Sequence, residues 1–333
     1  MNNLTNEYMR KSVFTLCLLL VWSLAVVGQT ESTSSATITF FRTPSSLLPG
    51  LFSVSETKRV KFAKGNLQYL ASQKIWRFAD HQYDIIGDAP GNTTPEAQRS
   101  NQGYWIDYFG WGTSGYRSDG AKAWQPWHTS TTNSDYCPNV KSEASWSGAY
   151  ANCDWGTHNF TSNFDEGYRV LTADEWYYLF YTRRGTKDDN DATTLKGIGT
   201  LFGMPGLFLL PDDWSWSDID SEILEKADNF VFIGDNNNFS RNVIKDNSDG
   251  HALWSAMETN GAVFLPAAGW REGLTVNNVG LSLYYHTSTS AAASTSESMK
   301  SVAFGNNGAN IANLVSSSGR RMIGRSVRLV KDY

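Results

Sequence analysis

The most regular hydrophobic pattern in the chain follows Thr172. Apolar side chains recur there at the i, i+3 and i+4 spacing of one helix face, at Trp176, Leu179 and Phe180. Thr172 and Glu175 have the spacing of a capping box, in which each side chain satisfies a backbone N–H of the other residue. Arg183 suits the negative end of this helix, and Gly185 suits the left-handed residue after it. The pattern predicts a helix from about 173 to 184.

Shorter patterns predict strands elsewhere in the chain. Residues 60–63 and 66–70 flank Lys64-Gly65 and are predicted to form a hairpin, with a third, alternating strand at 75–78. The remaining predicted elements are a helix at 251–258 that ends at Asn260-Gly261, and strands at 262–265, 299–304 and 326–330. No repeat of about 20 to 50 residues is present, which argues against a solenoid or a propeller.

Residues 103–156 show neither helical nor strand periodicity, but they hold six tryptophans: Trp105, Trp111, Trp124, Trp127, Trp146 and Trp155. Coil of this length needs packed side chains if it is to be ordered inside a domain. Aromatic residues make up 14% of the chain, which is enough apolar surface to exclude disorder over most of its length. We expect most of these rings to bury coil, and we place Trp76, Trp105, Trp111 and Trp176 in the core.

The first 28 residues have the order of a secretory signal peptide. Arg10 and Lys11 precede a 16-residue apolar run that begins at Ser12, and Gly28 stands at the expected cleavage site. The alternative is an N-terminal membrane anchor, which fits less well because about 20 apolar residues are needed to span a bilayer. No transmembrane segment is expected after signal removal. We expect an extracytoplasmic chain, either secreted or at the outer cell surface.

Two cysteines, Cys137 and Cys153, remain after signal removal. They have 15 residues between them. In an oxidising compartment they predict one disulfide, with two buried thiols as the alternative. Residues 29–50 are rich in Ser and Thr and are interpreted as a spacer, which leaves 51–333 as a single domain.

The chain is mildly acidic. It has 28 Lys plus Arg and 33 Asp plus Glu, for a formal net charge of −5. The leader carries Glu7, Arg10 and Lys11, so its removal changes the charge to −6. Nucleic acids and anionic lipids bind clustered basic residues, and the chain has no long basic run. Nucleic acid is therefore not expected as the main partner.

Several segments resemble the formylglycine-generating-enzyme (sulfatase-modifying factor) superfamily. Residues 169–185 resemble its R-L-P-T-E-A-E-W…R-G segment, and residues 324–330 resemble its closing G-F-R-V-V strand. The second segment is more similar still to the G-x-S-V-R-x-V of a bacterial surface branch, the Fibrobacter succinogenes major paralogous domain. Further stretches that fit this branch lie at 60–69, 261–269 and 284–289. Leu171 departs from the family's Pro, and His286 departs from its Trp.

The resemblance covers most of residues 51–333 and implies a fold. That fold is α+β and C-type-lectin-like, with a small antiparallel sheet that brings the two termini close together, two helices, and extensive aromatic-rich coil. The periodicity of the chain independently indicates two helices, scattered strands and long coil, so the two lines of argument agree.

The oxidase chemistry of the superfamily is not expected in this chain. The resemblance implies a pair of copper-binding thiols near the C-terminal strands, but no Cys follows Cys153. The five histidines lack the spacing of metal ligands. No nucleophile motif is present, and Asp212-Asp213 are interpreted as the cap of a short turn. We predict no catalytic residue, no metal ligand and no cofactor.

Calcium is the one cofactor that stays open. Residues 235–238 and 246–250 supply many side-chain oxygens, but neither stretch has the spacing of a calcium-binding loop. Solvated turns are the favoured interpretation of both.

The resemblance also implies a ligand-binding face, because related proteins bind through their C-terminal strands and loops. We expect exposed side chains there, and arginine and aromatic residues suit protein contacts. The predicted ligand-binding residues are Trp270, Arg271, Tyr285, His286 and Arg321, with Glu272, Tyr284 and Arg320 beside them.

Together these features predict a non-catalytic binding module that recognises a glycan or a protein ligand at the cell surface. Two alternatives remain open. One is an extracytoplasmic enzyme of the superfamily with an unrecognised site, and the other is a structural component of the surface or of fimbriae.

Overall fold

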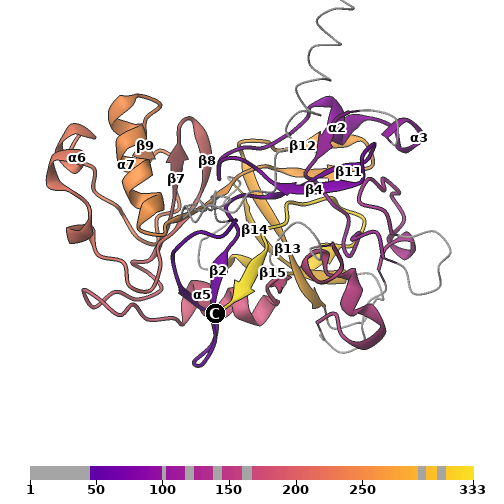
Figure 1. Cartoon of the computed structure of the whole chain (residues 1–333), viewed down its shortest axis with the longest axis horizontal. Helices are drawn as coiled ribbons and strands as arrows, with labels where there is room; N and C mark the ends of the chain where they lie inside the picture. Colours follow the sequence, from indigo (N-terminus) through magenta and orange to yellow (C-terminus); the bar gives the residue numbers. More distant parts are fainter. Residues whose placement is uncertain are drawn as a thin grey trace, which may run out of the picture. The chain divides into compact units, whose positions relative to one another are not determined.

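The computed structural model of the chain describes most of the predicted domain. The described residues are 46–99, 103–116, 124–137, 145–159, 167–291, 298–305 and 313–333. They form an α+β structure of short, mostly antiparallel strands with few helices (Figure 1). The predicted signal peptide, 1–28, and residues 29–45 of the predicted spacer lie outside the described residues. Within the described ranges, no helix is both long enough and apolar enough to cross a membrane.

One antiparallel sheet joins the two ends of the domain. It consists of β1 (Phe52–Ser53), β2 (Arg59–Phe62), β16 (Val330–Asp332) and β6 (Tyr168–Arg169), in that order. The last strand, β16, therefore pairs with β2 near the domain's start, and the C-terminus lies beside β2 in Figure 1. This sheet brings the two ends of the domain together, as expected.

The predicted hairpin at 60–70 is wrong. β3 (Leu67–Leu70) pairs with β4 (Ile75–Phe78) and with β5 (Trp105–Ile106), and it does not pair with β2. The two segments around Lys64-Gly65 belong to different sheets. The hairpin is formed one strand later, by β3 and β4.

The C-terminal segment explains why the chain passes from one sheet to another at Lys64-Gly65. The Ala63 N–H donates to the Leu329 carbonyl at 2.9 Å, and the Leu67 N–H donates to the Val327 carbonyl at 2.9 Å. The C-terminal backbone thus takes the hydrogen bonds that a local hairpin would have made. The connection also requires a glycine at position 65, because an added Cβ atom would lie 2.4 Å from the Ala79 carbonyl oxygen.

The folded domain also begins earlier than predicted. Leu48 is buried, and its N–H donates to the Phe62 carbonyl at 2.8 Å. The backbone of Ser46 accepts from the Lys64 N–H at 2.9 Å. Residues 46–50, assigned to the spacer, therefore belong to the packed domain.

The helix after Thr172 is confirmed as α5 (Ala173–Tyr181). The Thr172 hydroxyl accepts from the Glu175 N–H at 3.1 Å, and the Glu175 carboxylate accepts from the Thr172 N–H at 2.9 Å, which completes the capping box. Arg169 pairs with Glu175 at 2.7 Å and with Asp332 at 2.6 Å. The start of the helix is thereby tied to the last strand of the domain.

The predicted end of this helix is wrong. The helix stops at Tyr181, and Gly185 is not among the residues with positive φ. Gly185 is instead required by a close approach, because an added Cβ would lie 2.6 Å from the Asn190 Cβ. The role predicted for Arg183 at the helix end is partly correct, since its Nε donates to the Leu179 carbonyl at 2.9 Å.

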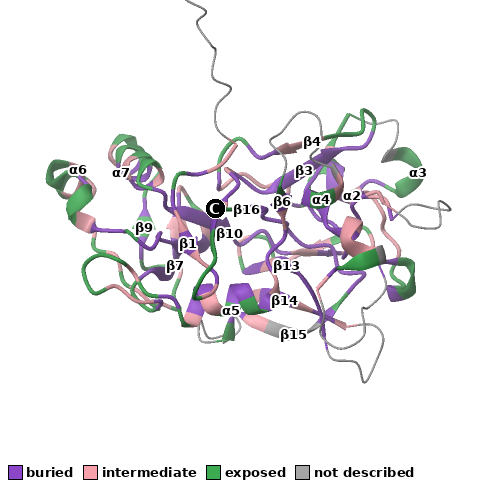
Figure 2. Ribbon diagram, turned by 60° about the horizontal axis from the view of Figure 1, so that its bottom comes forward, coloured by how far each residue is buried: buried purple, intermediate pink, exposed green. Residues whose placement is uncertain are grey.

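A second sheet has the order β10-β8-β7-β9. Its strands are β7 (Lys196–Leu201), β8 (Met204–Leu209), β9 (Val243–Ile244) and β10 (Val263–Pro266), and the pair β7–β9 is parallel. Beside it lie α6 (Ser221–Lys226) and α7 (Ser248–Thr259), which pack together and carry exposed faces (Figures 1 and 2). The predicted strand at 262–265 is thus confirmed.

The predicted helix at 251–258 is confirmed within α7, which begins three residues earlier. The Asn247 side chain caps it by accepting from the Gly250 N–H at 2.8 Å. The helix ends at Thr259 with Asn260 as its C-cap, as expected, and Gly261 follows with a φ of 92°.

A third sheet has the antiparallel order β13-β14-β15. Its strands are β13 (Ser282–Ser290), β14 (Ser298–Gly305) and β15 (Val315–Arg320), and β11 (Trp270–Glu272) pairs separately with β12 (Thr275–Asn277). The strand predicted at 299–304 is confirmed. Of the strand predicted at 326–330, only Val330 joins a ladder, while Ser326 makes a single bridge to Tyr285.

The other helices are short. They are α2 (Pro90–Thr93), α3 (Glu96–Arg99), α4 (Trp155–Asn159), and the 3₁₀ turns η1 (Asn133–Asp135), η2 (Gly148–Cys153) and η3 (Trp216–Asp218).

Aromatic rings pack the described parts of the coil predicted at 103–156, as expected. Trp111, Trp146 and Trp155 are buried in one cluster. The ring centroid of Trp146 lies 4.8 Å from that of Trp111 and 5.5 Å from that of Trp155. Trp176 is buried as well, whereas Trp76 and Trp105, also predicted as core, are only partly buried. In the described parts of this segment, side-chain packing largely replaces backbone ladders.

The predicted disulfide between Cys137 and Cys153 is present, and both cysteines are buried within the same tryptophan cluster. Their Cα atoms are 6.6 Å apart. Gly112 packs directly against the bridge, because an added Cβ would lie 2.3 Å from the Cys137 Cβ. The disulfide therefore joins Cys137 and Cys153 at a closely packed point of the tryptophan cluster.

Asp212 does not act as a turn cap. Its buried carboxylate pairs with the buried guanidinium of Arg183 at 3.0 Å and accepts from the Ser53 N–H and hydroxyl at 2.7 and 2.6 Å. Asp213, its neighbour, is exposed. Asp212 therefore links three distant segments in the core, a role that its position beside Asp213 does not reveal.

Candidate functional site

The structure buries most of the residues predicted to bind a ligand. Arg271 and His286 are each 2% exposed, Tyr285 is fully buried and Arg321 is 5% exposed, whereas Trp270 is half-buried. The expectation that all five side chains are exposed is therefore wrong for four of them. Each of the four has a defined interior partner.

The cause of this burial is the path of residues 321–330. Their backbone forms isolated bridges with three separate segments, pairing Gly324 with Arg271, Ser326 with Tyr285, and Arg325 with Phe109. The C-terminal segment therefore runs through the interior of the domain. Figure 2 shows the neighbouring strand β13 buried along much of its length.

Arg271 holds the coil against β11. Its guanidinium donates to the backbone carbonyls of Gly273 at 2.8 Å, Tyr108 at 3.0 Å and His128 at 3.1 Å. Burial lowers the pKa of this guanidinium, and nearby acidic groups including Asp107 oppose the shift. A rigid guanidinium with several donors is well suited to cross-linking carbonyl groups of irregular backbone.

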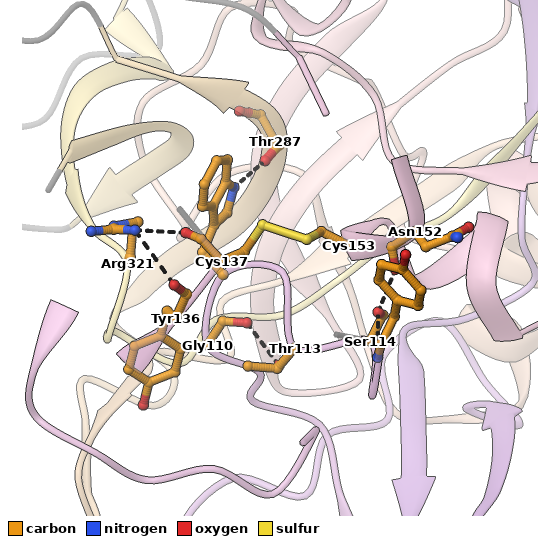
Figure 3. Close-up of a disulfide and its surroundings, with 11 residues drawn as sticks. Gly110, Thr113, Ser114, Tyr136, Cys137, Asn152, Cys153, Thr287 and Arg321 are labelled. Carbon is orange, nitrogen blue, oxygen red and sulfur yellow. Dashed lines mark hydrogen bonds between the residues drawn. A yellow bond between two sulfur atoms is a disulfide. The ribbon is translucent and has the colours of Figure 1, made fainter. Parts of the chain in front are cut away.

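Arg321 has a similar position at the disulfide. Its guanidinium donates to the Cys137 carbonyl at 2.7 Å, and the close-up in Figure 3 shows it beside the bridge. Its own carbonyl accepts from the Trp111 N–H at 2.9 Å. Arg321 therefore connects the end of the third sheet to the disulfide-bonded coil.

Tyr285 and His286 point into the interior. The Tyr285 hydroxyl donates to the Asn66 side-chain oxygen at 3.1 Å. The His286 Nε2 lies 2.6 Å from the Phe109 carbonyl oxygen, so Nε2 carries the proton and donates. The imidazole ring packs 5.4 Å from the Trp155 ring.

The electrostatic environment keeps His286 neutral. Burial is the main cause, and the nearby charge of Arg325 adds to it, lowering the pKa of His286 to about 3. An imidazole in an unfolded chain has a pKa near 6.5. The unfolded state therefore binds a proton that the folded state does not bind, at every pH between these two values.

We expect this difference to make stability fall with acidification. Because the unfolded state binds more protons below about pH 6.5, the free energy of unfolding decreases as the pH falls toward 3. His286→Gln keeps an N–H donor and does not titrate. Between pH 7.5 and pH 4.5, wild type should lose about 2–3 kcal/mol relative to this variant in urea unfolding. A stability difference that stays constant with pH would contradict the buried, neutral assignment.

Four side chains of the predicted face remain at least partly accessible: Trp270, Glu272, Tyr284 and Arg320. Tyr284 packs near the guanidinium of Arg325, and the other three define the Trp270 face. Trp270 is half-buried and packs against a cluster formed by Tyr136, Met322 and Ile323. The Glu272 carboxylate pairs with the Arg320 guanidinium at 3.1 Å, with 32% and 52% of the two side chains exposed. These residues come from β11 and the end of β15. The ion pair is accessible, so its contribution to stability is at most about 1 kcal/mol.

Two buried carboxylates have raised pKa values but carry structural hydrogen bonds. Burial is the main cause that raises the pKa of Asp107 to about 6, and the same holds for Asp154. Asp107 accepts from the Ile86 N–H and from the Asn92 amide, each at 2.7 Å. These carboxylates are enclosed and already engaged, so neither is offered to a substrate.

The two oxygen-rich stretches weighed for calcium are engaged with protein groups. The Asp235 carboxylate pairs with the buried ammonium of Lys196, and Asn247 caps α7. Among the described residues, no group of three or more His, Cys, Asp or Glu side chains could hold a metal ion.

Comparison with known proteins finds no matching family model, no matching curated protein and no matching solved structure. The functional argument therefore depends on the residues of this chain.

Proposed function

We propose that this chain is a non-catalytic binding module with a C-type-lectin-like fold, related to the surface branch of the formylglycine-generating-enzyme superfamily. It acts outside the cytoplasm, secreted or at the outer cell surface, and recognises a glycan or protein ligand through its C-terminal strands and loops. The single observation that carries the binding proposal is the Trp270 face: an accessible indole beside an accessible ion pair, supported by immobilised arginines.

The physical argument concerns preorganisation. Arg271 lies between Trp270 and Glu272 in the sequence, and its three carbonyl partners fix the backbone of β11. A rigid surface loses little conformational entropy when it binds. Tryptophan and arginine are the side chains most enriched in protein hot spots, so the chemistry of this face favours a protein ligand over a glycan.

The sequence supports the non-catalytic assignment, because it lacks residues that the superfamily's oxidase reaction needs. No Cys follows Cys153, so the copper-binding thiol pair implied by the resemblance has no counterpart. The similarity in fold is supported by the confirmed capping box of α5 and by the sheet that joins both ends of the domain.

The test is a screen of the purified mature domain against protein and glycan arrays. Trp270→Ala and Arg320→Ala should each weaken binding of the ligand found by about tenfold or more, which corresponds to about 1.4 kcal/mol. Arg241→Ala is the matched control, because Arg241 is an exposed arginine in a loop on another part of the chain. The proposal is refuted if the wild-type domain binds nothing, or if every ligand that it binds is held equally well by all three variants.

A further inference from the structure

Four aromatic rings from three separate segments meet at the surface, and none of them belongs to the Trp270 face. We call them the aromatic strip: His81, Tyr83, Phe202 and His251. The His81 and Tyr83 rings are stacked at 5.1 Å with an interplanar angle of 11°, Tyr83 meets Phe202 edge-on at 5.2 Å, and Phe202 lies 4.0 Å from His251. The contacts run in series from one histidine to the other.

Both ends of the strip are accessible and polar. The His81 Nδ1 lies 3.1 Å from the Asp84 carboxylate, and the His251 Nε2 lies 2.9 Å from the Asp246 carboxylate. The two imidazole side chains are 62% and 53% exposed. In each imidazole, one ring nitrogen faces the carboxylate, so the other ring nitrogen points away from that carboxylate. Hydrogen-bonding groups therefore flank the rings at each end.

Phe202 occupies a position that disfavours its own side chain. It begins the two-residue connection between β7 and β8, with a φ of 51°, and Gly203 follows with a φ of 84°. Turns with two positive φ values prefer Asn-Gly, and a bulky residue there costs about 1–2 kcal/mol. Backbone outliers of this kind cluster at ligand-binding sites. In this turn position, the Phe202 ring lies between the rings of Tyr83 and His251.

The surroundings of Tyr83 restrict the charge of a ligand. Partial burial is the main cause that raises the pKa of its phenol, and the nearby carboxylates of Asp84, Glu258 and Asp246 add to the shift. The hydroxyl therefore stays protonated and able to donate. Three carboxylates around one ring repel an acidic ligand.

We propose that the aromatic strip is a binding site for a neutral saccharide. The apolar C–H faces of sugar rings pack on aromatic rings, and sugar hydroxyls both donate and accept hydrogen bonds. The strip offers both kinds of partner, since its carboxylates accept and its tyrosine donates. This site shares no residue with the Trp270 face, so it does not depend on the function proposed for that face.

Binding of neutral, amino and acidic oligosaccharides on an array, followed by titration calorimetry of the neutral hits, tests this site. Tyr83→Ala should weaken binding of a neutral saccharide by about tenfold or more, while Tyr83→Phe keeps the ring and should keep most of the affinity. Phe202→Asn should weaken binding equally without loss of the folded state, because Asn suits the turn better than Phe does. Thermal unfolding of each variant verifies that it is folded.

A control variant separates this site from other exposed tyrosines. Tyr177→Ala removes another exposed tyrosine, on α5, and should leave saccharide affinity unchanged. The proposal is overturned if wild type binds no neutral saccharide, or if Tyr83→Ala binds as wild type does. Preferential binding of choline or of a lysine-rich peptide would also overturn it, since it would show that the rings select a cation.

Discussion

Asp212→Ala is expected to lower the free energy of unfolding of the mature domain by about 3–5 kcal/mol. The Arg183 side chain is 0% exposed and that of Asp212 only 4%, so the variant leaves a guanidinium buried without its counter-charge. It also removes the acceptor for the N–H and hydroxyl of Ser53. Urea unfolding followed by tryptophan fluorescence measures the loss.

The adjacent residue supplies a matched control for this prediction. Asp213 is exposed, so Asp213→Ala should change stability by no more than about 0.5 kcal/mol. Replacing both partners, with Arg183→Met and Asp212→Leu, should recover part of the loss because no unpaired charge remains. Equal urea midpoints for Asp212→Ala and Asp213→Ala would show that the buried ion pair does not form.

Removing the disulfide with Cys137→Ala and Cys153→Ala is expected to cost about 3 kcal/mol, because the bridge closes a loop with a sequence separation of 16 residues. In the chain-entropy model, the bridge stabilises the fold by restricting the conformations of the unfolded chain. Urea unfolding of the double variant and of wild type, each with and without reductant, measures the effect.

Reductant provides the internal control for the disulfide. It should destabilise wild type by a similar amount and leave the double variant unchanged, since the variant has no bridge to break. Equal stability of oxidised wild type and the double variant would contradict a stabilising role for the bridge.

Local signals in the sequence were sufficient to locate the two longest described helices, α5 and α7. The capping box at Thr172 and Glu175 depends on residues three apart, so the pattern alone locates the start of α5. Strand pairing depends on distant partners. The alternation at 60–63 indicates a strand, but it carries no information that β16 at the far end of the domain will pair with it. The hairpin error arises from this difference.

The candidate site also depends on partners that are distant in the sequence. Arginine and histidine in polar contexts normally lie at the surface, and the prediction for Arg271 and His286 followed that tendency. Their burial depends on carbonyl acceptors at Tyr108 and Phe109, and every residue has a carbonyl, so sequence cannot identify which ones turn inward. The aromatic strip was missed because its rings come from segments with no shared spacing.

Recognition through the Trp270 face requires that Trp270 is accessible in the free domain and covered in the complex. Oxidation of tryptophan by hydroxyl radicals tests both requirements most directly. In the free domain, Trp270 should be oxidised much faster than Trp111 and Trp155, which are fully buried. Adding a ligand of this face should protect Trp270 and leave the oxidation of other accessible residues unchanged. Slow oxidation of Trp270 in the free domain, or oxidation that the bound ligand does not reduce, would contradict recognition through the Trp270 face.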